Sequence, residues 1–280
     1  MQCCDLQGIL NLQSYPLNNP NSTHYKDLIQ RLRAELQANG IVLLPNFMTK
    51  TGIDSTLRSL QDKKIEPYRK EVTHNVYLED HVRKNEEEFP NQNHPKRFHV
   101  RSCKTCYTND QIDSKSPINV LFYADEMTDF IRDVLGKEKL YRTADPLGAL
   151  NVHMYKEGDE LGWHFDRGEF AVTLLLQAPE SGGKFEFYPD LRSEQNSNYP
   201  KVQEILLAAR EGQDVSKHGV QVADQLEAGT LSIFCGHNSL HRVTKIVGQK
   251  PRYLAVLSYE NEPNVHLNEY TKMKFFGRIQ

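Results

Sequence analysis

Three residues whose types and spacing could bind a metal stand in the second half of the chain: His164, Asp166 and, much later, His241. Residues i and i+2 of an extended segment share a face, so the imidazole and carboxylate of His-x-Asp can converge on one ion. Two histidines and one carboxylate hold Fe(II) on one side and leave the opposite coordination positions open. The pattern therefore predicts a non-heme iron site with His164, Asp166 and His241 as ligands.

Arg252 follows His241 at a separation that allows a turn and a returning strand. A guanidinium group is planar and permanently charged, so it can bind a carboxylate through two parallel hydrogen bonds. We therefore expect Arg252 to anchor a carboxylate-bearing ligand close to the metal.

The segments around these residues read GWHFDRGEFAVTLLLQAPESGGKFEF, GHNSLHRVT and PRYLAVLSY. They resemble the Fe(II)/2-oxoglutarate oxygenases of the prolyl-hydroxylase type and, more narrowly, the halogenase/hydroxylase family that acts on free amino acids. The resemblance is dense over residues 140–260. It implies Fe(II) as the metal, 2-oxoglutarate and O2 as cosubstrates, ascorbate as the reductant in vitro, and release of succinate and CO2.

The same resemblance suggests residues that contact the cosubstrate. Tyr155 precedes His164 by nine residues, the position of a tyrosine that hydrogen-bonds 2-oxoglutarate in related oxygenases. His153 shares a strand face with Tyr155, and Gln177 lies on the next strand, so both are further cofactor-binding candidates. The alternative for each is a polar group that is buried and bonded within the core.

Asp166 bears on the product, because in the resembling halogenases this position is a glycine and the freed site takes chloride. Its presence here favours hydroxylation over chlorination. Desaturation or ring formation uses the same ligand set and stays open. The alternative outside enzymes is a cupin-like ligand sensor without catalysis.

The residue after Asp166 bears on the substrate. In the resembling halogenases it is acidic and contacts the substrate amine, whereas here it is Arg167, with Glu169 nearby. A basic residue favours an anionic or zwitterionic small polar molecule, with Arg167 and Glu169 as substrate-binding candidates. An amino acid fits this expectation, as does a natural-product intermediate of secondary metabolism, for example a guanidine alkaloid of the cylindrospermopsin kind.

Composition argues against several other classes of protein. The 280 residues carry a formal net charge of −3, which argues against general binding of nucleic acid or lipid surfaces. No segment approaches the ~18 apolar residues of a membrane span, and the first residues lack the pattern of a signal peptide. Five cysteines, an odd number, fit reduced thiols. We expect a cytoplasmic protein with a small-molecule substrate and no nucleic-acid or membrane partner; its oligomeric state stays open.

The elements that must position these residues divide the chain into a helical front and a β-rich back. Short strands separated by turns predict a mainly β fold with flanking helices and a double-stranded β-helix core, which is a cupin-like jelly roll. We expect an N-terminal helical and lid region (1–139), the catalytic core (140–262) with an insertion (190–217), and a C-terminal tail (263–280). One helix is expected between a cap at residues 21–23 and a stop at residues 39–40, and further helices are expected over 51–61, 117–135 and 202–210. The expected strands cover 41–44, 149–155, 170–177, 184–188, 230–235, 240–244 and 252–259.

Residues 62–116 are polar and highly charged, which predicts a long loop that could form a lid over the site. Cys103 and Cys106 form a C-x-x-C within it. No second pair of ligands with zinc-site spacing lies nearby, so we expect these cysteines to be free thiols on that loop.

Overall fold

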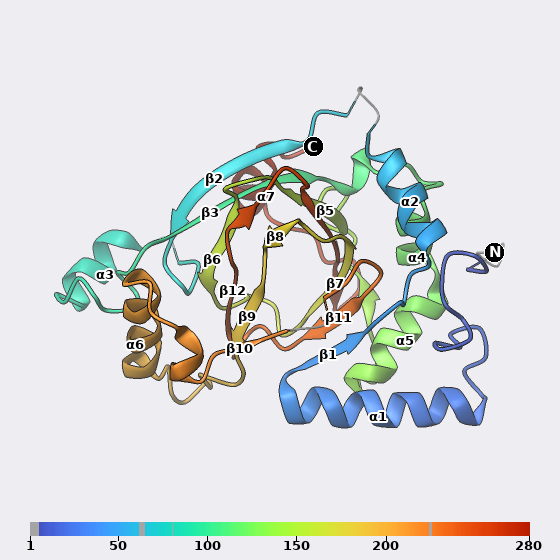
Figure 1. Cartoon of the computed structure of the whole chain (residues 1–280), viewed down its shortest axis with the longest axis horizontal. Helices are drawn as coiled ribbons and strands as arrows, with labels where there is room; N and C mark the ends of the chain where they lie inside the picture. Colours follow the sequence, from blue (N-terminus) through green and yellow to red (C-terminus); the bar gives the residue numbers. More distant parts are fainter. Residues whose placement is uncertain (1–5, 62–64, 80, 224–225) are drawn as a thin grey trace.

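The computed structural model describes residues 6–61, 65–79, 81–223 and 226–280. A strongly curled antiparallel sheet occupies its centre, with helices packed along the outside (Figure 1). The predicted fold class, a mainly β jelly roll with flanking helices, is confirmed.

Within these described residues, eleven strands form one sheet in the order β1-β11-β7-β14-β5-β3-β6-β12-β9-β10, and β2 pairs with β3 off this path. Two small sheets, β13-β8 and β15-β4, lie beside it. The strands are β1 (Ile41–Leu44), β2 (Tyr68–His74), β3 (Val100–Tyr107), β4 (Tyr141–Arg142), β5 (Leu150–Tyr155), β6 (Glu160–His164), β7 (Ala171–Gln177), β8 (Ser181–Gly182), β9 (Phe185–Tyr188), β10 (Gln221–Val222), β11 (Leu231–Phe234), β12 (Leu240–Val243), β13 (Ile246–Val247), β14 (Arg252–Leu257) and β15 (Tyr259–Glu260).

Two groups of helices flank this sheet (Figure 1). Helices α1, α2, α4 and α5 lie on the side of β1, and α3 and α6 lie beside β6. They are α1 (Thr23–Asn39), α2 (Lys50–Ser59), α3 (Val82–Glu88), α4 (Pro117–Tyr123), α5 (Asp125–Leu135), α6 (Tyr199–Arg210) and α7 (Glu269–Phe276), with 3-10 turns at Asn109–Gln111 and Val215–His218. The expected helix 202–210 is thus confirmed with three more residues at its start.

Helix α1 illustrates how local sequence sets these elements. The Ser22 hydroxyl accepts the Tyr25 amide, and Gly40 ends the helix with a φ of 70°, a left-handed conformation that glycine adopts without a steric penalty. Apolar residues at helical spacing, including Leu28, Leu32 and Leu36, are buried against the sheet. Burying one such side chain stabilises the fold by about 1.5–3 kcal/mol.

The expectation of a long loop over residues 62–116 is wrong, because this segment contains β2, α3 and β3. Along β2, half-buried and exposed residues alternate strictly. Its charged residues therefore reflect a strand with one solvated face rather than a solvated loop. Cys103 and Cys106 are free thiols, as expected, but they lie buried on β3 and not on a loop.

The single helix expected over residues 117–135 is two helices, α4 and α5, with Ala124 extended between them at a ψ of 130°. Asp125 and Glu126 start α5, where carboxylates near a helix N-terminus are favourable. The side chain of Arg142 bonds the Ala124 carbonyl and Asp125, which holds the break in place.

The C-terminal tail packs back on the barrel through α7. Phe276 is buried together with Cys106 and Leu147, and Lys272 forms an ion pair of 2.9 Å with the fully buried carboxylate of Asp145. Three strands from before residue 140 join the same sheet as the later strands, so the sheet crosses the boundary expected there. Among the described residues, no helix is long and apolar enough to span a membrane.

Candidate metal centre

The two predicted histidine ligands lie opposite each other on neighbouring strands. His164 ends β6 and His241 lies in β12, and the antiparallel register pairs these two residues directly. Both side chains are buried, and their ring centroids are 4.1 Å apart. The long separation of the two histidines in sequence is thus closed by a single strand pairing.

Each histidine has its tautomer fixed by a backbone carbonyl. Nδ1 of His164 lies 2.8 Å from the Gly162 carbonyl oxygen, and Nδ1 of His241 lies 2.9 Å from that of Ser239. A carbonyl oxygen only accepts, so Nδ1 carries the proton in both rings and the Nε2 lone pair is free for a metal.

Asp166 completes the cluster from just beyond the end of β6. Its Oδ1 lies 3.5 Å from Nε2 of His164 and 3.5 Å from Nε2 of His241, and the three ligand atoms lie within 4.8 Å of one another. Burial opposes ionisation of Asp166, but the positive charge that a histidine of the cluster carries when it is protonated at Nε2 outweighs burial and holds the carboxyl pKa well below its ordinary value. The result is a charged carboxylate facing two Nε2 lone pairs, which is the donor set of a facial iron triad.

Gly236 makes room for this carboxylate. The Asp166 amide donates to the Gly236 carbonyl at 3.0 Å, and a Cβ at Gly236 would lie 1.9 Å from Oδ2 of Asp166. This residue was not predicted from the sequence, although a glycine two residues past the end of β11 and ahead of His241 is a signal of close approach.

Arg252 and Tyr155 face each other across the register of β14 and β5, with the guanidinium carbon 5.6 Å from the Tyr155 ring centroid. Both side chains are buried, yet Nη1 of Arg252 and the Tyr155 hydroxyl have no hydrogen-bond partner. Burial raises the pKa of Tyr155 to about 12, so its hydroxyl stays a donor. Buried donors without partners are costly, and a carboxylate of 2-oxoglutarate would satisfy both groups.

His153 has a neighbour that sequence reasoning did not find. Nζ of Lys104, on β3, lies 3.2 Å from both ring nitrogens of His153. Burial, together with Lys104 and Arg252, lowers the pKa of His153 well below its ordinary value, so the ring is neutral. Ser102, Lys104 and Cys106 are alternate residues of β3 and share one face of that strand. This pattern was not recognised because the segment was predicted to be a loop.

The other predicted residues bond elsewhere in the protein. Gln177 donates through Nε2 to the Pro251 carbonyl at 2.7 Å. Arg167 is exposed and donates to the Leu78 carbonyl at 2.6 Å. Glu169 pairs with Lys137 at 2.7 Å, with 62% of its side chain exposed. Their roles toward cosubstrate and substrate stay predictions, and each would have to exchange these contacts for a ligand.

A cap segment, residues 75–79 and 81–99, lies against the end of β6 where the triad begins. The Phe165 amide donates to the Val76 carbonyl at 2.7 Å, and the rings of Tyr77 and Phe165 stack at 5.4 Å. Leu78 has a φ of 56°, an unusual conformation for a branched side chain. The cap therefore contacts the strand that carries His164 and, through Leu78, the exposed side chain of Arg167.

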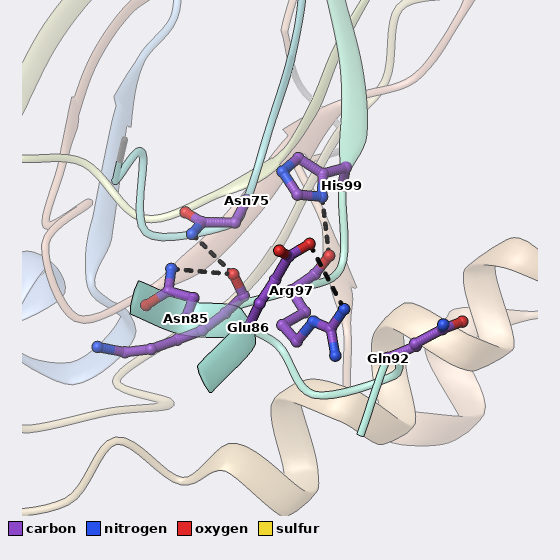
Figure 2. A pocket seen from close by; sticks show the side chains of 7 residues that line it. Asn75, Asn85, Glu86, Gln92, Arg97 and His99 are labelled. Carbon is purple, nitrogen blue, oxygen red and sulfur yellow. Dashed lines mark hydrogen bonds and ion pairs between the residues drawn. The ribbon is translucent and has the colours of Figure 1, made fainter. Parts of the chain in front are cut away.

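Figure 2 shows a polar cavity of ≈ 250 Å³ inside the cap. Nδ2 of Asn75 and Nδ2 of Asn85 both donate to the Lys96 carbonyl, at 3.0 and 3.3 Å, and Arg97 pairs with Glu86 at 3.7 Å. None of the triad residues lines this cavity. Two of its side chains pair with each other and three bond backbone carbonyls of the cap, so its polar groups hold the cap together.

A curled antiparallel sheet carrying two histidines and one aspartate on adjoining segments defines an Fe(II)/2-oxoglutarate-dependent oxygenase. The sequence matches the model of the Halogenase D (HalD) family over residues 25–274. The chain belongs to this family.

Solved structures share the fold. A 2OG-Fe(II) oxygenase family oxidoreductase from Burkholderia pseudomallei aligns with a TM-score of 0.50 and 16% identity, covering 85% of this chain and 92% of that one. The epimerase SnoN of nogalamycin biosynthesis aligns with a TM-score of 0.52 and 13% identity, covering 84% of each chain. AviO1 from Streptomyces viridochromogenes aligns with a TM-score of 0.52 and 12% identity, covering 84% of this chain and 96% of that one. No curated protein matches the sequence.

Proposed function

We propose that this protein hydroxylates an unactivated C–H bond of a small polar molecule, an amino acid or a natural-product intermediate. The observation that carries the proposal is the Asp166 carboxylate, whose Oδ1 lies 3.5 Å from Nε2 of each histidine. A carboxylate in this position fills the coordination site that a halogenase needs for chloride. The triad therefore supports hydroxylation within a family named for halogenation.

His164, Asp166 and His241 would hold Fe(II), and Arg252 with Tyr155 would hold the far carboxylate of 2-oxoglutarate. Iron and 2-oxoglutarate together supply the oxidation of the C–H bond by O2, with release of succinate and CO2. The protein contributes two Nε2 lone pairs for the metal, a buried guanidinium and a protonated phenol hydroxyl. Strand pairing holds all of these groups in place before any ligand binds. Such preorganised charges act strongly because water is excluded.

The test is an anaerobic reconstitution with Fe(II), followed by a screen for succinate release with 2-oxoglutarate, ascorbate and O2. The candidate substrates are amino acids, guanidino compounds, and carboxylated or sulfated metabolites. Mass spectrometry should then find a product with one added oxygen atom, also when chloride is in excess. A chlorinated product would contradict the argument from Asp166, and a product that has lost two hydrogens would indicate a desaturase or cyclase.

His164→Ala, Asp166→Ala and His241→Ala should each abolish turnover and reduce bound iron, whereas His24→Ala, an exposed histidine on α1, should leave both unchanged. Full activity and full iron content in any one triad variant would remove that residue from the metal site. Iron binding by the wild type without succinate release for any compound would favour a ligand sensor.

A further inference from the structure

Lys104 on β3 is a half-buried cation that the proposed reaction has not used. Its Nζ lies 3.2 Å from both ring nitrogens of His153, and no carboxylate of the described residues forms an ion pair with it. A neutral histidine offers one lone pair, whereas an ammonium group has three protons to donate. Among the hydrogen bonds of the described residues, at least two donors of Lys104 therefore have no protein acceptor.

The surrounding wall of the barrel carries two lysines and two histidines, and burial lowers the pKa of both histidines so that their rings are neutral. On β2, the half-buried residues Lys70, Val72 and His74 form one face, and the register places Lys70 opposite Lys104 and Val72 opposite Ser102. The His74 ring lies 6.3 Å from the His164 ring and bonds the Ser102 hydroxyl at 2.6 Å. This basic wall, formed by Lys70, His74, Lys104 and His153, therefore runs from the metal centre along β2, β3 and β5.

The charges near the metal do not balance without ligands. Arg252 and Lys104 contribute two positive charges and the metal two more, while Asp166 contributes one negative charge among the described residues of the centre. 2-Oxoglutarate brings two negative charges, which the iron and Arg252 would take up. One positive charge, that of the half-buried Lys104, is left for another anion, and withdrawing a charge from water without a partner is unfavourable.

We propose that Lys104, supported by His153, binds an oxyanion group, carboxylate or sulfate, of the substrate. This inference rests on the proposed function and moves the anion contact from Arg167, which donates to the Leu78 carbonyl, to the basic wall of the barrel. Burial lowers the pKa of Lys104, and an anion beside its Nζ would favour the charged form. Substrates without an anionic group would leave this cation unpaired and bind poorly.

The test measures binding without turnover. The protein is loaded with Mn(II) and 2-oxoglutarate in the absence of O2 and titrated calorimetrically with sodium sulfate and, separately, with sodium acetate. Because 2-oxoglutarate occupies Arg252, the probe reports on Lys104. We expect saturable binding of at least one probe to the wild type, and the tighter of the two distinguishes a sulfate from a carboxylate site.

Lys104→Met should weaken the probe by at least about tenfold, Lys104→Arg should retain part of the affinity, and Lys26→Met on α1 should match the wild type. The dissociation constant of 2-oxoglutarate should be unchanged in all three variants, which also shows that they fold. A Lys104→Met variant that loses 2-oxoglutarate and keeps the probe would assign Lys104 to the cosubstrate and overturn the proposal. So would a wild type that binds neither probe. Failure to find any hydroxylated product would leave these binding constants unaffected and would count against the proposed reaction alone.

Discussion

Arg252 and Tyr155 show how much a single strand pairing can determine at the scale of residues. Their register across β14 and β5 puts two buried donors side by side, and neither Nη1 of Arg252 nor the Tyr155 hydroxyl has a partner in the protein. A pair of donors held this way is ready for a carboxylate and unfavourable without one.

Arg252→Leu should therefore raise the 2-oxoglutarate KM strongly, because losing a buried charge pair costs about 2 kcal/mol or more, roughly a factor of 30 in affinity. Tyr155→Phe removes one hydrogen bond to a charged group, which should cost about 1.5–3 kcal/mol. Steady-state kinetics with varied 2-oxoglutarate would measure both. A normal KM with a lowered melting temperature would instead identify Arg252 as a cross-strand structural residue.

Gly236 offers a second test at this scale, one that does not change a ligand. Gly236→Ala places a Cβ where Oδ2 of Asp166 now lies, so the carboxylate must move. We expect about 10–100-fold weaker metal binding, the range seen when groups that orient a ligand are altered. The matched control is Gly168→Ala, whose new Cβ would meet its nearest atom, the Phe170 carbonyl oxygen, at 3.7 Å. Equal metal affinity in the two variants would show that Asp166 tolerates displacement.

At the scale of elements, the cap depends on the buried side-chain amide of Asn75. Oδ1 of Asn75 accepts the amides of Tyr77 and Glu79, each at 3.1 Å, and its Nδ2 donates to Lys96. Asn75→Ala should loosen the cap selectively, with faster amide hydrogen exchange in peptides covering residues 75–98 and little change in β7, β11 and β14. Asn91→Ala, which removes a single exposed turn contact, is the control. Unchanged protection of the cap in Asn75→Ala would mean that its apolar contacts suffice.

The elements also mark where sequence reasoning succeeded and failed. Strands rich in apolar residues, such as β7 and β11, are correctly predicted because burial on both sides leaves a continuous apolar run. β2 was missed because its solvated face carries Arg69, Glu71 and Thr73, and charge density masked the period of two. The strands that were not predicted matter for function. Because β3 was predicted to be part of a loop, Lys104 was not recognised as a candidate site residue.

At the scale of the whole molecule, the C-terminal segment is tied to the barrel by a buried ion pair. Asp145 is fully buried and accepts the amides of Leu147, Gly148 and Leu267 as well as the ammonium of Lys272. Burial raises the pKa of this carboxyl, but Lys272 and the amides outweigh it, so the pKa lies below its ordinary 3.8. A group with a depressed folded pKa stabilises the protein above its unfolded pKa, and this contribution is lost as the pH falls.

Lys272→Met should therefore lower the free energy of unfolding at neutral pH by about 3–5 kcal/mol, because it leaves a buried carboxylate without its cation. The difference between wild type and variant should shrink as the pH falls below about 4, where Asp145 is protonated in the unfolded chain. Urea titrations at several pH values would measure this, with Lys26→Met as a charge-matched control. A difference that persisted unchanged into acid would exclude a role for the Asp145 charge.

The metal cluster and the fold class could be predicted because one sequence motif indicates both. Strand pairings between distant segments could not be predicted. The His-x-Asp and second histidine predict the metal cluster, and the cluster in turn selects the jelly roll. The pairing of β3 with both β5 and β6 has no local signal, because it depends on strand partners far apart in the chain. The basic wall arises from that pairing, so its members could be assigned only in three dimensions.

That pairing also separates two tasks along the gene. The segment that encodes β2 and β3, with Lys70, His74 and Lys104, ends well before the first metal ligand at His164. If Lys104 binds the substrate as we propose, mutation or recombination in this early segment can alter what is recognised while the iron ligands encoded later are inherited unchanged. Related proteins could thus acquire different substrates through changes in the segment of β2 and β3 alone. Laboratory evolution aimed at new substrates should find its productive mutations in that segment.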